Sequence, residues 1–364
     1  MKLFQSIFKF SLVAAIAAAW AMPGAAFSGD IPDPLPDPAG EAADTSEPVQ
    51  VYVLLGQSNM LGFGKVNGNG DGTLENAVKN KGLYPYLVDD QGNWTERKDA
   101  RYVRVMHSRG SMSTFNNEWL TVPRGKIGPE LGIGHYMAWY HDKPVLILKS
   151  CIGNRSLGWD LLPPGAERFE HQHGGKTYVY PGYKDEVRHS KWEKGNVPNP
   201  PKHGWYAGKQ YDDDIGNAKW VLDNIGQHYP GAQEYEVRGF FWWQGDKDMR
   251  DPGHADRYEH NLVTLIEALR KDFNAPDAKF VTATLGQTRK GSGGGDGKIL
   301  EAMFNLADPQ KHPDLAGDVA AVYTHPLSKG GSSSGHYSGN AETYMNVGEA
   351  MGKAMVELMQ ADEE

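Results

Sequence analysis

The sequence predicts an α/β fold, a three-layer α/β/α sandwich with a central five-stranded parallel sheet. Two observations predict this arrangement. Five short apolar segments alternate with helical patterns along residues 49–364. Each segment is rich in β-branched or aromatic residues and nearly continuous in apolar character, as expected for parallel strands that are covered on both faces.

The predicted strands and helices follow one another in a regular order. Strands are expected at residues 50–56, 145–150, 237–243, 279–285 and 319–324. Helices are expected at residues 128–141, 216–229, 257–273, 298–307 and 341–359, so each of the last four strands follows a helix. Two long irregular segments, about residues 65–125 and 160–212, interrupt the pattern, and we expect ordered loops there that form the walls of a cleft.

The N-terminus has the pattern of a secretory signal peptide. Lys2 and Lys9 precede a short apolar stretch at residues 10–22, and small-residue cleavage sites follow before residue 27. The alternative is a membrane anchor, but the stretch is shorter than the roughly 20 residues that a span needs. We therefore expect a signal peptide at 1–26 and a secreted or periplasmic protein. A disordered Pro-rich and acidic linker is expected at 27–48, followed by one domain at 49–364.

Composition excludes one class of partner. The formal net charge is −9, which argues against nucleic acid, because phosphate binding needs clustered Lys and Arg. An acidic sugar stays possible, since a local basic patch can lie on an acidic protein. The single cysteine, Cys151, cannot form an intramolecular disulfide, and its apolar neighbours predict a buried thiol.

Two motifs follow directly on predicted strands. In Gly56-Gln57-Ser58-Asn59-Met60, Ser58 stands where an open parallel sheet places its ligands, so its hydroxyl is a candidate nucleophile and its N–H a candidate oxyanion donor. The alternative is that Ser58 only caps a following helix. After the second strand, Gly153 lets the backbone approach a ligand, although an ordinary glycine turn explains it equally well.

Further candidates follow the third strand and precede the last helix. Gln244 offers an amide donor to developing negative charge, and Asp246 and Asp248 are candidates to orient a histidine; the alternative is a solvated acidic loop. A serine nucleophile needs a base with a pKa near neutrality, and His336 is the candidate because it stands between the fifth strand and the terminal helix.

Together these motifs resemble the sialate O-acetylesterase-type branch of the SGNH hydrolases, and carbohydrate esterase family 6 is similar. The resemblance spans roughly residues 49–358 and implies a flavodoxin-like topology. It implies that Ser58 is the nucleophile of a carbohydrate O-acetylesterase and His336 its general base. The oxyanion hole would consist of the Ser58 N–H, the Gly153 N–H and the Gln244 amide.

The sequence departs from the family pattern at one position. SGNH enzymes often carry an aspartate three residues before the histidine, and here that residue is Ser333. Asp246 or Asp248 therefore orients His336, or the enzyme works as a Ser-His dyad.

Other interpretations remain open. A carbohydrate-binding protein that has kept the fold but lost activity is the main alternative to the enzyme, and a lipase or peptidase on the same fold is another. The expected partner is an acetylated carbohydrate whose sugar the sequence does not identify. His171 and His173 lack a third ligand at recognisable spacing, so no metal and no cofactor is predicted.

Overall fold

The computed structural model describes residues 30–38, 40–108, 110–200 and 204–363. The predicted signal peptide at 1–26 lies outside these residues. In the described parts of the predicted linker, 30–38 and 40–48, there is no helix or strand, but the side chain of Leu35 is buried in the core.

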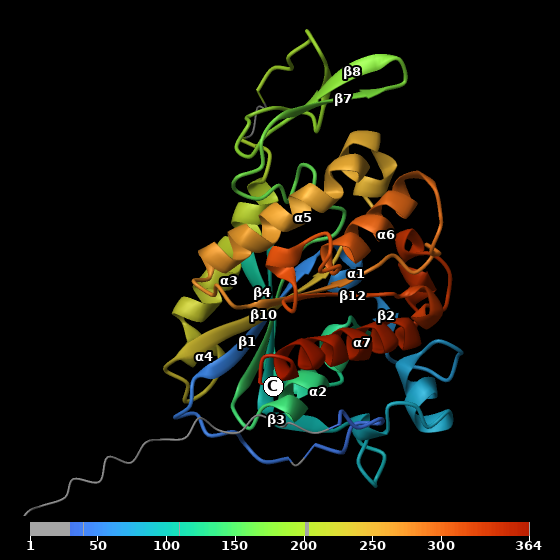
Figure 1. Cartoon of the computed structure of the whole chain (residues 1–364). Helices are drawn as coiled ribbons and strands as arrows, with labels where there is room; N and C mark the ends of the chain where they lie inside the picture. The colour runs from blue at the N-terminus through green and yellow to red at the C-terminus, as the bar shows by residue number, and fades with distance from the viewer. Residues whose placement is uncertain (1–29, 39, 109, 201–203, 364) are drawn as a thin grey trace, which may run out of the picture.

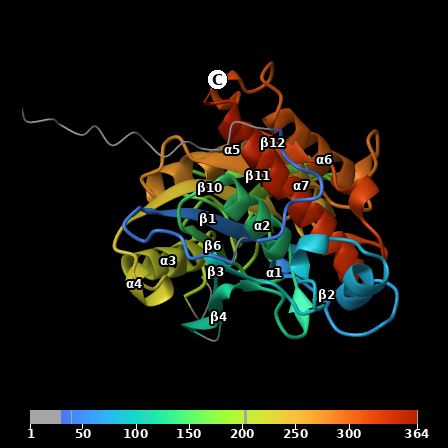
Figure 2. The ribbon, with the colours of Figure 1, turned by 90° about the horizontal axis from the view of Figure 1, so that it is seen from below.

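A twisted seven-stranded sheet forms the centre of the molecule (Figures 1 and 2). Its order is β12 (Val319–Val322), β11 (Lys279–Ala283), β10 (Tyr235–Trp243), β1 (Val49–Gly56), β6 (Val145–Ser150), β3 (Glu96–Ser108) and β4 (Ser111–Thr121). All neighbours are parallel except β3 and β4, which form an antiparallel pair.

The five predicted strands are confirmed as β1, β6, β10, β11 and β12, but the predicted total of five was wrong. Strands β3 and β4 extend the sheet from the segment that we expected to be irregular. Their sequences do not have the pattern of a buried strand, because neither forms a continuous apolar run. Strand β4 is a half-exposed edge strand, and β3 begins with Glu96-Arg97-Lys98-Asp99.

The predicted flavodoxin-like topology is confirmed. Numbered along the chain, the five predicted strands lie in the order 2-1-3-4-5, with β1 between β6 and β10. The chain therefore leaves β1 toward one side of the sheet and reaches β10 on the other side. In doubly wound sheets, ligands bind at the carboxyl ends of the two strands where the direction reverses, here β1 and β10.

Helices cover both faces of the sheet (Figures 1 and 2). On one face, α2 (Glu130–Tyr140) and α7 (Ala341–Gln360) pack on a core that includes Tyr52 and Leu54 of β1. On the other face, α3 (Lys209–Asp223), α5 (Pro252–Asp272) and α6 (Gly294–Leu306) pack on a core that includes Val51 and Val53. The alternation along β1 thus supplies apolar side chains to both layers. The predicted helices are confirmed, with α3 followed by the one-turn helix α4 (Ile225–His228).

Shorter elements lie between these layers. The single-turn helix α1 (Ser58–Leu61) follows β1, and β2 (Gly64–Lys65) pairs with β5 (Lys126–Ile127). Short 3₁₀ or π turns occur at Asn76–Asn80, Pro85–Leu87, Asp248–Arg250, Pro313–Leu315, His325–Leu327 and Ser333–Gly339. No helix among the described residues has the length and apolar character needed to cross a membrane.

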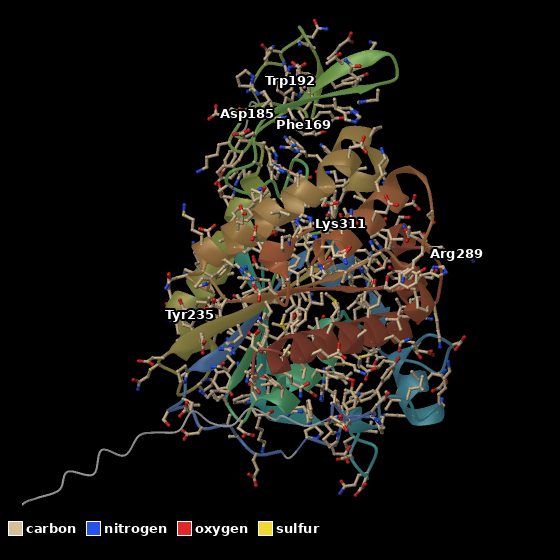
Figure 3. All side chains as sticks on the ribbon, viewed as in Figure 1. Phe169, Asp185, Trp192, Tyr235, Arg289 and Lys311 are labelled. Atoms are coloured by element: carbon tan, nitrogen blue, oxygen red, sulfur yellow. The ribbon has the colours of Figure 1, made fainter. Side chains whose placement is uncertain are left out.

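A small antiparallel sheet projects beyond the N-terminal end of α5 (Figure 1). It consists of β7 (Phe169–His173), β8 (Lys176–Tyr180) and β9 (Trp192–Glu193), in the second segment that we expected to be a loop. Phe169 and Trp192 lie in this sheet (Figure 3), and the ring of Phe169 stacks on Tyr180 at 4.7 Å.

The end of β1 leaves no room for a side chain at Gly56. Its φ is +143°, and a Cβ atom there would lie 2.4 Å from the carbonyl oxygen of Trp243 in β10. We predict that Gly56→Ala lowers the free energy of unfolding by about 2–4 kcal/mol, because the backbones of two core strands must separate. Urea denaturation measures the change.

Gly216→Ala is the matched control. Gly216 lies inside α3, and a Cβ atom there would meet nothing within 4 Å. We expect it to raise stability by about 0.5–1 kcal/mol, as alanine does in helix interiors. Equal stability of the two variants would contradict the proposed close packing of β1 on β10.

Candidate functional site

A pocket of about 360 Å³ opens where the carboxyl ends of the central strands meet. Its walls come from the segments that follow β1, β6 and β10 and from the turn that precedes α7. The lining residues are Gln57, Ser58, Phe63, Gly153, Asn154, Asp246, Lys247, Arg250, Ser334 and His336. The structure therefore brings together Ser58, Gly153, Asp246 and His336, which lie far apart in the sequence.

Ser58 is the first residue of α1 and is half-buried at the pocket. The residue at the N-cap position is Gln57, and no side chain caps this helix, so Ser58 is not the helix cap of the alternative interpretation. Within the described residues, the Ser58 hydroxyl has no hydrogen-bond partner. It is therefore free to react with a bound molecule.

Gly153 lies directly against Ser58. A Cβ atom at Gly153 would be 3.5 Å from Cβ of Ser58 and 3.9 Å from its Cα. A larger side chain would therefore fill the space beside the serine. The glycine keeps this space open for a ligand and leaves the local backbone accessible to it.

His336 lies in a strained turn. His336, Tyr337 and Ser338 all have left-handed backbones, with φ of 51°, 51° and 54°. Such conformations cost roughly 1–2 kcal/mol per residue, and they persist where the surroundings enforce them. Tyr337 supplies the anchor, because it is fully buried, stacks on Trp243 and accepts the N–H of Gly286 through its hydroxyl oxygen at 3.1 Å.

The imidazole of His336 stacks on Phe63. The ring centroids are 4.1 Å apart and the planes are inclined by 11°. Phe63 was not among the predicted site residues, and no local signal marks it, because a single aromatic residue in a glycine-rich segment has many explanations. Its position next to α1 connects the histidine turn with the serine turn.

The two aspartates have different surroundings. Asp246 lines the pocket and accepts a hydrogen bond from Asn59 Nδ2 at 3.3 Å, whereas its Oδ1 is buried without a partner among the described residues. Burial raises the pKa of Asp246 above its ordinary value, and the neighbouring Ser333 side chain and then the charges of Arg250 and His336 act in the opposite direction. Asp246 is thus close enough to His336 to interact with it electrostatically.

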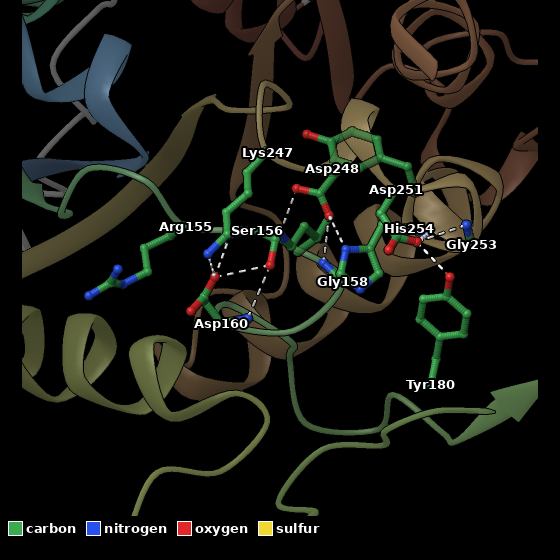
Figure 4. Close-up of polar contacts among 12 residues, drawn as sticks. Arg155, Ser156, Gly158, Asp160, Tyr180, Lys247, Asp248, Asp251, Gly253 and His254 are labelled. Atoms are coloured by element: carbon green, nitrogen blue, oxygen red, sulfur yellow. Dashed lines mark hydrogen bonds and ion pairs between the residues drawn. The ribbon is translucent and has the colours of Figure 1, made fainter. Parts of the chain in front are cut away.

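Asp248 does not line the pocket, and its side chain lies against Gly158 and His254 (Figure 4). Its fully buried carboxylate accepts the N–H of Leu157 at 2.9 Å and the N–H of Gly158 at 2.8 Å. His254 lies on its other side, with Nδ1 at 3.9 Å. Burial raises the pKa of Asp248 above its ordinary value, against the effect of these contacts.

Gln244 belongs to the same buried network. Its Nε2 donates to the carbonyl oxygen of Arg155 at 2.8 Å and to Asp248 at 2.5 Å, and its Oε1 accepts the hydroxyl of Tyr258 at 2.8 Å. Both amide hydrogens are therefore engaged beneath the pocket, which Gln244 does not line. In this arrangement the amide supports the loop that carries Gly153.

Asn59 is a connecting residue that the sequence-based assignment missed. Its Nδ2 donates to Asp246 and to the carbonyl oxygen of Ser333, each at 3.3 Å, and its Oδ1 accepts the hydroxyl of Tyr344 at 3.4 Å. One buried amide thus connects the serine turn, the β10 loop and the histidine turn. Its place beside Ser58 in the first motif was the available signal.

His171 and His173 lie outside the pocket, on β7. Their Nδ1 atoms face each other at 3.1 Å, and His171 Nε2 lies 2.7 Å from Asp256. Within the described part of the chain, no group of three potential metal ligands is present.

Comparison with known proteins shows what this chain is similar to. The family model described as carbohydrate esterase, sialic acid-specific acetylesterase, matches residues 189–357. The chain resembles the sialic acid-specific acetylesterases. The resemblance predicted from the motifs is thereby confirmed over a range that includes Gln244, Asp246 and His336.

The similar proteins include a plant relative. The probable carbohydrate esterase At4g34215 of Arabidopsis thaliana is 33% identical over 72 residues, which are 20% of this chain and 26% of that protein. The match thus spans about a quarter of the relative's length. The crystal structure of this Arabidopsis protein covers 85% of the chain and 98% of its own, with 15% identity and a TM-score of 0.47.

Two further solved structures are similar over most of the chain. XAC1771, a carbohydrate acetylesterase from Xanthomonas citri, covers 84% of this chain and 55% of its own, with 13% identity and a TM-score of 0.45. NanS covers 78% of this chain and 79% of its own, with 14% identity and a TM-score of 0.44.

The raised pKa of Asp246 predicts a pH-dependent effect of Asp246→Asn. Because the folded protein holds the proton of Asp246 more tightly than the unfolded chain does, the contribution of Asp246 to the parent's stability falls as the pH rises from about 3 through the folded pKa. The asparagine variant has no such loss. We expect its free energy of unfolding, relative to the parent, to increase between pH 3 and pH 7.

Asp44→Asn is a control of opposite sign. Hydrogen bonds from Ser46 lower the pKa of the exposed Asp44, so its ionised form favours the fold. This variant should lose stability relative to the parent as the pH rises over the same interval. Parallel curves for the two variants in urea denaturation would contradict the assignment of Asp246 as a buried, destabilising charge.

Proposed function

We propose that this chain is a secreted serine esterase that hydrolyses O-acetyl esters on carbohydrates. One observation carries the proposal: the unbonded hydroxyl of Ser58 lies in a single pocket with Gly153, Asp246 and His336. The similarity to sialic acid-specific acetylesterases supports the class of substrate.

The proposed mechanism is acyl transfer in two steps. The Oγ atom of Ser58 attacks the acetyl carbonyl carbon while His336 removes the hydroxyl proton. His336 then protonates the departing sugar oxygen, and the acetyl group remains bound to Oγ of Ser58 as an ester. In the second step His336 activates a water molecule, which releases acetate and restores the serine.

The backbone N–H groups of Ser58 and Gly153 are the proposed oxyanion donors. A good donor of this kind contributes roughly 3–4 kcal/mol to the stability of the transition state. Gln244 remains the third proposed donor. It can reach the oxyanion only if it exchanges its hydrogen bond to Arg155 or Asp248 for one to the substrate.

Asp246 is the better candidate to orient His336. It lines the pocket and interacts electrostatically with the histidine, whereas both oxygens of Asp248 accept hydrogen bonds that hold other groups. In the family pattern an aspartate often stands at the position that Ser333 occupies here. We propose that Asp246 performs the role of that aspartate. A Ser-His dyad is the alternative.

A sugar acid such as sialic acid is the proposed substrate class. Arg250 lies at the pocket, exposed, and forms no salt bridge within the described residues. Its guanidinium group is suited to bind a carboxylate by two parallel hydrogen bonds.

A non-catalytic carbohydrate-binding protein is the second candidate function. The observation that favours it is Ser333, because the usual catalytic aspartate is absent from this position. Such a protein would bind the acetylated sugar equally well with or without the Ser58 hydroxyl.

Replacement of Ser58 by alanine tests the nucleophile. We predict that Ser58→Ala lowers kcat for p-nitrophenyl acetate by at least about a thousandfold, as the loss of a serine nucleophile does in other hydrolases. Ser334→Ala, in the same pocket, should stay close to the parent. If the parent is inert toward p-nitrophenyl acetate and acetylated glycans but binds the glycans, the binding-protein function is correct instead.

Replacement of Arg250 by glutamine tests the substrate class. We predict that Arg250→Gln raises KM for an acetylated sialic acid by about 10-fold to 100-fold, because a charged hydrogen bond is lost, and leaves KM for p-nitrophenyl acetate unchanged. Lys247→Gln is the control, since Lys247 is already paired with Asp160 at 2.7 Å. An equal effect of Arg250→Gln on both substrates would contradict a role in carboxylate binding.

A further inference from the structure

A buried ion pair lies beneath the serine turn. Lys149 of β6 is fully buried, and its ammonium group pairs with Glu130 at the start of α2. The exposed fraction of Glu130 is 4%. Buried ion pairs rarely add stability, since the cost of removing two charges from water offsets their attraction. A lysine inside an otherwise apolar strand therefore suggests a function other than stability.

The pair holds the chain on both sides of a close contact. Lys149 Nζ donates to the carbonyl oxygen of Leu61, the last residue of α1, at 3.3 Å. Glu130 Oε1 accepts the N–H of Gly128 at 2.9 Å. Gly128 in turn lies against Gly62, where a Cβ atom would be 2.5 Å from the Gly128 nitrogen.

The same contact fixes Phe63 and, through it, His336. Phe63 stands between Gly62, which packs on Gly128, and Gly64, which pairs with Ile127. The ring of His336 stacks on Phe63 at 4.1 Å. The segment held by the ion pair thus begins with the serine turn and ends at the support of the histidine.

We propose that Lys149 and Glu130 are positioning residues that set the relative placement of Ser58 and His336. The inference rests on the proposed esterase function. Neither residue lines the pocket, so neither touches the substrate. They act through Leu61 and Gly128, which they hold at the two ends of the Gly62 contact.

The double variant K149M/E130L tests this role. It removes both charges and keeps apolar volume, so we expect the urea midpoint to stay near the parent's. With p-nitrophenyl acetate, we expect kcat to fall by about 30-fold to 100-fold and KM to change by less than about threefold, because misplacement of reacting groups affects the chemical step. The amplitude of the acylation burst separates slow acylation from partial unfolding.

K279M/D318L is the matched control. Lys279 is also a buried lysine of a central strand, in β11, and pairs with Asp318 at 2.7 Å, but neither residue lines the pocket or contacts α1. Its kcat should equal the parent's. The variant K149Q/E130Q keeps a donor for Leu61 and an acceptor for Gly128, and we expect it to recover kcat to within about 3-fold to 10-fold of the parent.

The outcomes separate this inference from the proposed function. A stable K149M/E130L protein with the parent's kcat overturns the positioning role while the esterase stands. If K149M/E130L does not fold, K149M/E130Q decides, because it removes the donor to Leu61 and keeps an acceptor for Gly128. A kcat of that variant equal to the parent's overturns the role. A parent that hydrolyses no acetyl ester overturns the proposed function and this inference together, before any variant is compared.

Discussion

The parallel pairing of β1 with β10 is the constraint on which the rest of the site depends. The two strands pair from Val49 with Tyr235 to Gly56 with Trp243, so they end at the same level. Gly56 lets their backbones meet there, and the N–H of Gln57 donates to the carbonyl oxygen of Trp243 at 3.3 Å. Ser58 and Asp246 therefore emerge side by side, although almost 190 residues separate them in the chain.

Three buried groups convert this closeness into a fixed geometry. Asn59 connects the serine turn with Asp246 and with the turn that carries His336. Asp248 fixes the loop after Gly153 through two backbone N–H groups. Tyr337 holds the left-handed turn next to His336. The left-handed backbone of that turn and the burial of the Asp246 carboxylate both cost stability. Features of this kind cluster at catalytic sites.

The sequence predicts much of this arrangement, for identifiable reasons. The five inner strands can be predicted because burial on both faces makes them continuously apolar. Ser58, Gly153 and Asp246 can be predicted as site candidates because they follow such strands. Strands β3 and β4 cannot be predicted in this way, because an exposed edge permits charged residues. The stacking of Phe63 on His336 and the hydrogen bonds of the Gln244 amide cannot be predicted from the sequence either, because they depend on tertiary contacts. Lys149 is a charged residue within an apolar strand, and this pattern in the sequence is a signal of a buried ion pair.

The central claim is that these elements place a reacting acetyl group between Ser58, the backbone at Gly153 and His336. A crystal structure of the protein inhibited by a p-nitrophenyl phosphonate ester tests it most directly. The account predicts a phosphonyl group on Oγ of Ser58, with one oxygen about 2.7–3.1 Å from the backbone nitrogens of Ser58 and Gly153 and with His336 beside the ester oxygen. A phosphonyl group on another residue, or an oxygen that meets neither nitrogen, would contradict it.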